Sequence, residues 1–153
     1  MRIALAADHA GYPLKQHLVD YLKGQGHEVI DLGVNTDAVK SDYPDAAQAI
    51  GAAIHDGRAE RGILVCGSGV GACIAANKIR GVYASITHDV YSAHQGVEHD
   101  KMNVMCLGAL VVGKSVAQEL ANAFIGAQFD GVESHQRRFD KVQVLEAGLR
   151  TED

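Results

Sequence analysis

Apolar residues occur along the chain in two alternating patterns: short continuous runs, and longer stretches with helical spacing. The short runs are rich in Val, Ile, Leu and Ala, which is typical of buried strands; they lie at 3–7, 28–32, 62–66, 82–86 and 105–107. Between and after them, apolar positions three or four residues apart predict helices at about 13–23, 43–55, 72–78, 90–98, 114–124 and 136–149. Pro13 suits the first turn of the first helix, and Gly24 marks its end.

This alternation predicts an α/β fold. We expect a single three-layer domain with a Rossmann-like, mostly parallel sheet and helices on both faces. No linker divides the chain, so residues 1–153 are interpreted as one domain, with the helix at about 136–149 completing a site or a dimer. Sheets of this kind bind ligands at the carboxyl ends of their strands, so unusual residues just after strands are the candidates for function.

Charge, hydropathy and cysteine content narrow the class of protein. The formal net charge is −5 and no basic stripe is present, which argues against nucleic acid as a partner. No apolar stretch has the length of a signal-peptide core or a membrane span. The three cysteines, at 66, 73 and 106, do not form a disulfide framework. We therefore expect a cytoplasmic protein with reduced thiols and no membrane partner.

Glycine is the one residue in excess, with 17 in 153 positions. Three of these glycines, Gly67, Gly69 and Gly71, follow the strand at 62–66 and precede a helix. Such a turn can direct its backbone amides at a negative charge, helped by the positive end of the helix dipole. The spacing matches neither the dinucleotide fingerprint nor the P-loop, and a tight turn without any ligand fits the pattern equally well.

Cys66 and Ser68 on either side of Gly67 favour the functional interpretation of this loop. A cysteine that ends an apolar strand can be a small core residue. Beside a helix N-terminus it can also be a thiolate that acts as a base or a nucleophile. Cys73 and Cys106 are interpreted as core residues, and the cysteines and histidines lack the spacing of a zinc site, so we expect no metal.

Four further positions carry chemistry-bearing side chains. Asp8 and His9 follow the first strand at the ligand edge, and an aspartate can orient or charge a neighbouring histidine. His99 lies between two acidic residues at the end of a helix, either as a surface residue or in a site. Arg138 belongs to a local basic cluster at 134–138, either a solvated helix start or a clamp for a phosphate or carboxylate. These residues alone indicate an enzyme or binding protein for a small anion.

Longer segments match a known family over nearly the whole chain. The most specific match is 63–71 with 75–78; others lie at 7–15, 41–44, 88–93, 103–104, 107–108 and 111–113. The sequence resembles the type B ribose-5-phosphate isomerases, within a wider family that includes galactose-6-phosphate isomerases. The resemblance implies the aldose–ketose isomerisation of ribose 5-phosphate and ribulose 5-phosphate, in the pentose phosphate pathway, without metal or organic cofactor.

The resemblance also implies roles at the reacting end of the substrate. Cys66 would be the general base that moves a proton between C2 and C1 through a cis-enediolate. Ser68 would bind the substrate or relay a proton at the same end. The backbone amides of the loop would stabilise the enediolate oxygens; that loop comprises Gly67, Gly69, Val70 and Gly71 together with Ser68.

For the rest of the substrate, the resemblance implies that His99 assists opening of the furanose and that Asp8 holds sugar hydroxyls. His9 and Arg138 would contact the phosphate. The family's site lies at a homodimer interface, so His99 would serve the partner's Cys66. The partners expected are therefore a sugar phosphate and a second copy of the chain, with a tetramer as a further option.

Three positions depart from the family pattern. Asp100 stands where the family usually has asparagine, while Leu110 and Ser134 stand where it usually has arginine. Two guanidinium groups associated with the phosphate are therefore missing. This leaves open an isomerase of another phosphorylated or free aldose, such as allose, allose 6-phosphate or galactose 6-phosphate. A non-catalytic sugar-phosphate-binding protein is the alternative outside the enzymes.

Overall fold

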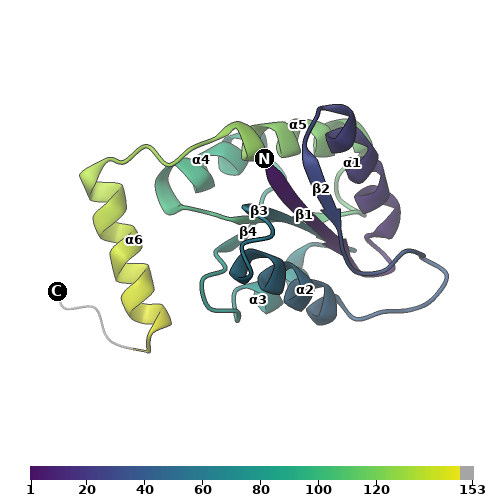
Figure 1. Ribbon diagram of the computed structural model, residues 1–153, viewed down its shortest axis with the longest axis horizontal. Coiled ribbons are helices and arrows are strands. Elements are labelled where there is room, and N and C mark those ends of the chain that lie inside the picture. The colour runs from purple at the N-terminus through teal and green to yellow at the C-terminus, as the bar shows by residue number, and fades with distance from the viewer. Residues whose placement is uncertain (149–153) are drawn as a thin grey trace.

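Five parallel strands form one sheet between two layers of helices in the computed structural model, which describes residues 1–148 (Figure 1). The sheet order is β2-β1-β3-β5-β4. The strands are β1 (Arg2–Ala7), β2 (Glu28–Asp31), β3 (Arg61–Cys66), β4 (Ala84–Ile86) and β5 (Val104–Gly108). The predicted fold class is confirmed, and the sheet is parallel throughout.

The helices are α1 (Tyr12–Gly24), α2 (Tyr43–His55), α3 (Val70–Ala76), α4 (Val90–Asp100), α5 (Lys114–Gly126) and α6 (Glu133–Glu146). Helices α1, α4 and α5 cover one face of the sheet, and α2 and α3 cover the other (Figure 1). The last helix, α6, stands beside these layers and packs on α4 (Figure 1). It begins and ends three residues before the predicted bounds of about 136–149, and residue 149 lies outside the described residues.

Burial explains why the central strands have continuous apolar runs. Both faces of β1, β3 and β5 are covered by helices, so nearly every side chain on them is buried. The edge strands β2 and β4 are only partly buried and carry polar residues. In the described part of the chain all three cysteines are free, and no helix has both the length and the apolar character needed to cross a membrane.

A buried lysine on α1 anchors the edge of the sheet. The predicted apolar face of this helix is confirmed, but Lys15 beside it is also buried, with 1% of its surface exposed. Its ammonium donates hydrogen bonds to Asp31 Oδ1 at 2.6 Å, to the Leu32 carbonyl at 3.2 Å and to the Val34 carbonyl at 2.8 Å. The aliphatic stem thus joins the core while the charge binds the chain that leaves β2.

We predict that Lys15→Met lowers the free energy of unfolding by about 2–3 kcal/mol, because it keeps the stem but leaves three acceptors without their donor. Urea unfolding measures the difference. Lys23→Met is the matched control on the exposed side of α1 and should change stability by less than about 0.5 kcal/mol. Equal effects of the two substitutions would contradict the anchoring role of Lys15.

Candidate active site

The sheet reverses its winding between β1 and β3. These strands are neighbours, yet the helix after β1 packs on one face of the sheet and the helix after β3 packs on the other. The carboxyl ends of two such strands leave a crevice between the diverging chains, which is where open α/β sheets bind ligands. Asp8, His9 and the Cys66–Gly71 loop all begin at this crevice.

Cys66 is the last residue of β3, and 4% of its surface is exposed. The amide of Gly69 donates a hydrogen bond to its sulfur at 3.1 Å. A donor at this distance gives the sulfur a fixed hydrogen-bond partner in the loop. The sulfur also lies on the core face that packs against α2 and α3, so Cys66 combines a buried position with a polar contact from the loop.

The turn after β5 holds the Cys66–Gly71 loop in place through main-chain hydrogen bonds. The amide of Ala109 donates to the Cys66 carbonyl at 2.8 Å, and the amide of Leu110 donates to the Gly67 carbonyl at 3.0 Å. Because these bonds involve main-chain atoms, the loop holds its path whatever its side chains do. The Leu110 side chain, 85% exposed, lies next to Gly67 and offers no charge there.

Gly108 allows the closest approach between the two segments. A Cβ atom at this position would lie 2.6 Å from the Ser68 carbonyl oxygen, so only glycine fits. Its amide donates to Nε2 of His88 at 2.9 Å. His88 thus holds the end of β5 against the loop, a contact that sequence reasoning did not identify.

Gly69 adopts a left-handed φ of 83°, which explains why α3 starts at residue 70, two residues before its predicted start.

Two amides of the loop are already engaged within it. Gly69 bonds to the Cys66 sulfur, and the amide of Val70 donates to Ser68 Oγ at 3.2 Å. The other amides of the loop are the better candidates to bind an anionic oxygen.

The ring of Tyr43, at the start of α2, lies against Gly71, where a Cβ would come within 2.7 Å of it. Tyr43 therefore borders the loop, although the sequence indicated only that it opens a helix.

Asp8 and His9 face the same crevice. Asp8 is buried and accepts a hydrogen bond from the Gly11 amide at 2.9 Å, which fixes the turn into α1. His9 is held from the loop before α2: its amide donates to Ser41 Oγ at 2.8 Å, and the Ser41 amide lies 3.1 Å from its Nδ1. The structure therefore brings Asp8, His9 and the Cys66–Gly71 loop together at one edge.

His99 and Asp100 lie at the opposite end of the sheet, near the amino ends of the strands. Helix α4 connects the carboxyl end of β4 to the amino end of β5, and both residues are in its last turn. Its 11 residues span about 16 Å, so its last turn lies far from the carboxyl end of β4, where the connection begins. A single chain therefore does not bring His99 or Asp100 to Cys66.

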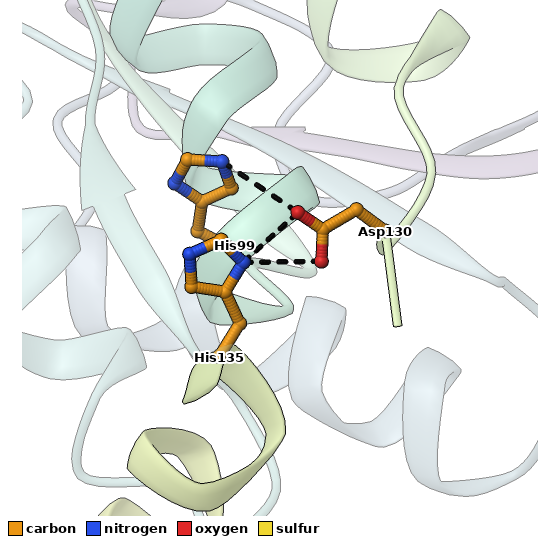
Figure 2. Close-up of side chains that lie close together, drawn as sticks. All are labelled: His99, Asp130 and His135. Atoms are coloured by element: carbon orange, nitrogen blue, oxygen red, sulfur yellow. Dashed lines mark hydrogen bonds and ion pairs between the residues drawn. The ribbon is translucent and has the colours of Figure 1, made fainter. Parts of the chain in front are cut away.

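His99 instead meets two residues that sequence reasoning did not single out (Figure 2). Its Nε2 lies 3.8 Å from Asp130 Oδ2, and the same carboxylate oxygen is 2.9 Å from Nδ1 of His135. The two imidazole rings stack with centroids 3.9 Å apart. The hydrogen bond from the Val132 amide lowers the pKa of the Asp130 carboxyl, and the two histidines lower it further by smaller amounts, which keeps the carboxyl ionised. His135 was noticed only as part of the basic cluster.

These three ligand atoms lie within 4.8 Å of one another, close enough for one cation to contact all of them. The two rings, however, are stacked with their planes inclined by only 24°, so their nitrogen lone pairs, which lie in the ring planes, do not converge on one point. A metal ion needs lone pairs that converge on it, so both rings would have to rotate. The arrangement as it stands suits a carboxylate that interacts with two imidazoles.

Arg138 lies on α6, three residues after His135, and is exposed. Within residues 1–148 its guanidinium has no ion-pair partner, whereas the neighbouring Arg137 pairs with Glu133 at 3.0 Å. A guanidinium left without an internal carboxylate is available to an external anion. Helix α6 starts at residue 133, so Arg138 lies in its second turn.

The other two cysteines differ from each other. Cys106 is fully buried, which confirms the interpretation as a core residue. Cys73 is only half-buried, and the hydrogen bond with the Cys106 thiol is the main reason that its pKa falls to about 7. Cys73 therefore packs against the core without being fully inside it, as the interpretation as a core residue had assumed.

Comparisons with known proteins agree with one another. The family model described as Ribose/Galactose Isomerase matches residues 3–142. The chain is 40% identical over 131 residues to the D-erythrulose-4-phosphate isomerase of Pectobacterium atrosepticum, covering 86% of each protein. It is 39% identical over 145 residues to ribose-5-phosphate isomerase B of Escherichia coli, covering 95% of this chain and 96% of the other.

A solved structure shows the same similarity in three dimensions. The ribose-5-phosphate isomerase B of Clostridium thermocellum superimposes with a TM-score of 0.93 at 37% identity. The match covers 97% of this chain and 99% of the other, so the whole domain shares that fold.

We predict that Gly108→Ala lowers the free energy of unfolding by about 2 kcal/mol, because the added methyl group forces the Ser68 backbone away from β5. Gly126→Ala is the control, since a Cβ there has no atom within 4 Å. Denaturant unfolding of both variants measures the effect. If Gly108→Ala is as stable as the control, the close contact between the turn and the loop does not constrain the fold.

Proposed function

Because the chain belongs to the ribose/galactose isomerase family and is an aldose–ketose isomerase of the ribose-5-phosphate isomerase B type, we propose that it interconverts ribose 5-phosphate and ribulose 5-phosphate. The observation that carries this proposal is Cys66 at the sheet crevice with the Gly69 amide on its sulfur. The reaction would belong to the pentose phosphate pathway.

The proton transfer takes place at Cys66. Its thiolate removes the C2 proton of the open-chain aldose, and the C1 carbonyl becomes part of a cis-enediolate. The proton then returns to C1, while the C2 oxygen loses its own proton and becomes the ketone. Ser68 relays the proton between the two oxygens, and the amides of Gly67, Ser68 and Gly71 stabilise the negative charge that develops on them.

The remaining residues bind and prepare the sugar. Asp8 accepts hydrogen bonds from sugar hydroxyls, and His9 and Arg138 contact the phosphate. His99 opens the furanose: the C1–O4 bond breaks, and the proton of the O1 hydroxyl is transferred to O4 through the imidazole. Asp100 lies beside His99 as an acceptor.

These roles require two copies of the chain, since Cys66 and His99 lie at opposite edges of the sheet in one copy. We infer a homodimer in which His99, Asp100 and Arg138 of one protomer complete the site around Cys66 of the other. Large exposed apolar side chains support such an interface; they include Ile74 on α3, Tyr91 on α4, Leu110 after β5 and Leu145 on α6. A groove of about 470 Å³ between β4, α4 and α6 includes Asp100 in its lining.

A tetrose phosphate is the second candidate substrate. One relative, 40% identical, is named D-erythrulose-4-phosphate isomerase. In this chain Leu110 and Ser134 provide no cations at the far end of the site, so a substrate that is shorter by one carbon would rely on the contacts nearer Cys66. The ratio of kcat/KM for ribose 5-phosphate and D-erythrulose 4-phosphate decides between the two candidates.

We predict that, in deuterated water, the enzyme converts ribose 5-phosphate into ribulose 5-phosphate with deuterium at C1, and that Cys66→Ala slows this at least about 100-fold. NMR follows both product and label. Cys73→Ser is the control, because it removes another titrating thiol outside the crevice, and it should retain activity within about threefold. Full activity of Cys66→Ala would refute the mechanism, and no ketose from the wild type would refute the substrate.

We also predict that a 1:1 mixture of the impaired variants Cys66→Ala and His99→Asn, unfolded and refolded together, recovers about a quarter of wild-type activity. In a two-fold dimer, half of the molecules are mixed, and each of these contains one intact site out of two. Steady-state assays before and after mixing provide the measurement. No recovery, with mixed dimers demonstrated by mass spectrometry, would show that one chain supplies the whole site.

A further inference from the structure

The carboxylate of Asp130 is held in place by the backbone around it. Its amide donates to the Glu98 carbonyl at 3.0 Å, which ties the segment between α5 and α6 to the last turn of α4. Its Oδ1 accepts from the Val132 amide at 3.0 Å. The carboxylate therefore has a fixed position relative to His99, on the neighbouring helix, before any substrate binds.

The two nitrogens of His99 have different surroundings. Nδ1 lies 2.9 Å from the side-chain nitrogen Nε2 of Gln95, one turn earlier on α4. Nε2 faces Asp130 Oδ2 at 3.8 Å, which is too long for a hydrogen bond. Nε2 is therefore held near a negative charge but remains available to a substrate atom, and about a third of the side chain is exposed.

His135 completes the enclosure of His99 (Figure 2). Its imidazole covers one face of the His99 ring, and its Nδ1 contacts both oxygens of Asp130, at 3.1 and 2.9 Å. His135 is the less exposed of the two histidines and is committed to the carboxylate. The ring of His99 is thus restricted by Gln95, Asp130 and His135, and only Nε2 is free to react.

We propose that Asp130 is a positioning residue for His99: it keeps Nε2 directed at the sugar and offsets the positive charge that the imidazole acquires during ring opening. When Nε2 takes the O1 proton and before it delivers that proton to O4, the imidazole is cationic. A carboxylate 3.8 Å away stabilises this cation and thereby the transition states on either side of it. This inference rests on the ring-opening role proposed for His99.

The two halves of the reaction can be measured separately. Ribose 5-phosphate is a furanose, so its conversion requires ring opening. Ribulose 5-phosphate cannot close a five-membered ring, because the oxygen it would use carries the phosphate. Exchange of its C1 protons with deuterated water therefore reports the chemistry at Cys66 without any contribution from ring opening.

We predict that Asp130→Asn lowers kcat for ribose 5-phosphate by about 10- to 100-fold, with KM changed less than about threefold. The rate of C1 exchange of ribulose 5-phosphate should stay within about threefold of the wild type. Asparagine preserves the shape of the side chain and an oxygen for the Val132 amide. Asp140→Asn is the matched control: it removes one carboxylate whose hydrogen-bond partner within residues 1–148 is Gln136 on α6, and both rates should remain unchanged.

A double variant separates positioning from a general loosening of the structure. In a His99→Asn background, Asp130→Asn should reduce ribose 5-phosphate turnover by less than about twofold further, because the ring that it positions is gone. The inference would be overturned if the effects of His99→Asn and Asp130→Asn on turnover multiply in the double variant. It would also be overturned if Asp130→Asn alone lowers C1 exchange as much as it lowers turnover. If His99→Asn itself lowers both rates equally, the ring-opening role fails instead.

Histidine NMR tests the same point without turnover. Asp130→Asn should change the imidazole nitrogen shifts of His99 and His135, whereas Asp140→Asn should leave both unchanged. Unaltered His99 shifts in Asp130→Asn would overturn the inference even in an active enzyme. If the wild type does not convert ribose 5-phosphate, the proposed substrate is wrong, and these spectra still decide whether Asp130 positions His99.

Discussion

The parallel sheet imposes the constraint on which the rest of the structure depends. Each connection between parallel strands must return from the carboxyl edge to the amino edge, and helices make most of these returns here. Residues at the start of a connection and residues at its end therefore lie on opposite sides of the molecule. Cys66 is at the start of one such return and His99 is at the end of another, so a single copy of the chain keeps them apart.

The two halves of the proposed site are held by different kinds of contact. The Cys66–Gly71 loop rests on main-chain bonds from the turn after β5 and on a glycine contact that no larger residue would permit. The group around His99 consists of side chains from α4, the segment before α6, and α6 itself, joined through one carboxylate. The first half is positioned by main-chain contacts, whereas the second depends on how α6 is placed against α4.

Where the predicted and observed elements differ, side-chain hydrogen bonds explain the difference. The apolar run at 82–86 predicts a strand of five residues, but β4 begins at Ala84. The amide of Tyr83 is taken by Asn103 Oδ1, and Asn77 uses both its amide nitrogen and its oxygen on the backbone of Ala84. Likewise, periodicity favoured Leu14, Leu18 and Leu22 as core residues of α1 but could not show that Lys15 is buried, since its partners lie on another element.

The sequence by itself determined the alternation of strands and helices, the parallel sheet and the loop at Cys66, because these depend on patterns within a few residues. It also located Asp8 and His9, which follow a strand directly. Only the tertiary structure decided that His99 meets Asp130 and His135, since a carboxylate and two imidazoles far apart in the sequence become neighbours only when α6 packs on α4. It also showed which helix packs beside α4, because the position of α6 depends on contacts between side chains that are distant in the sequence.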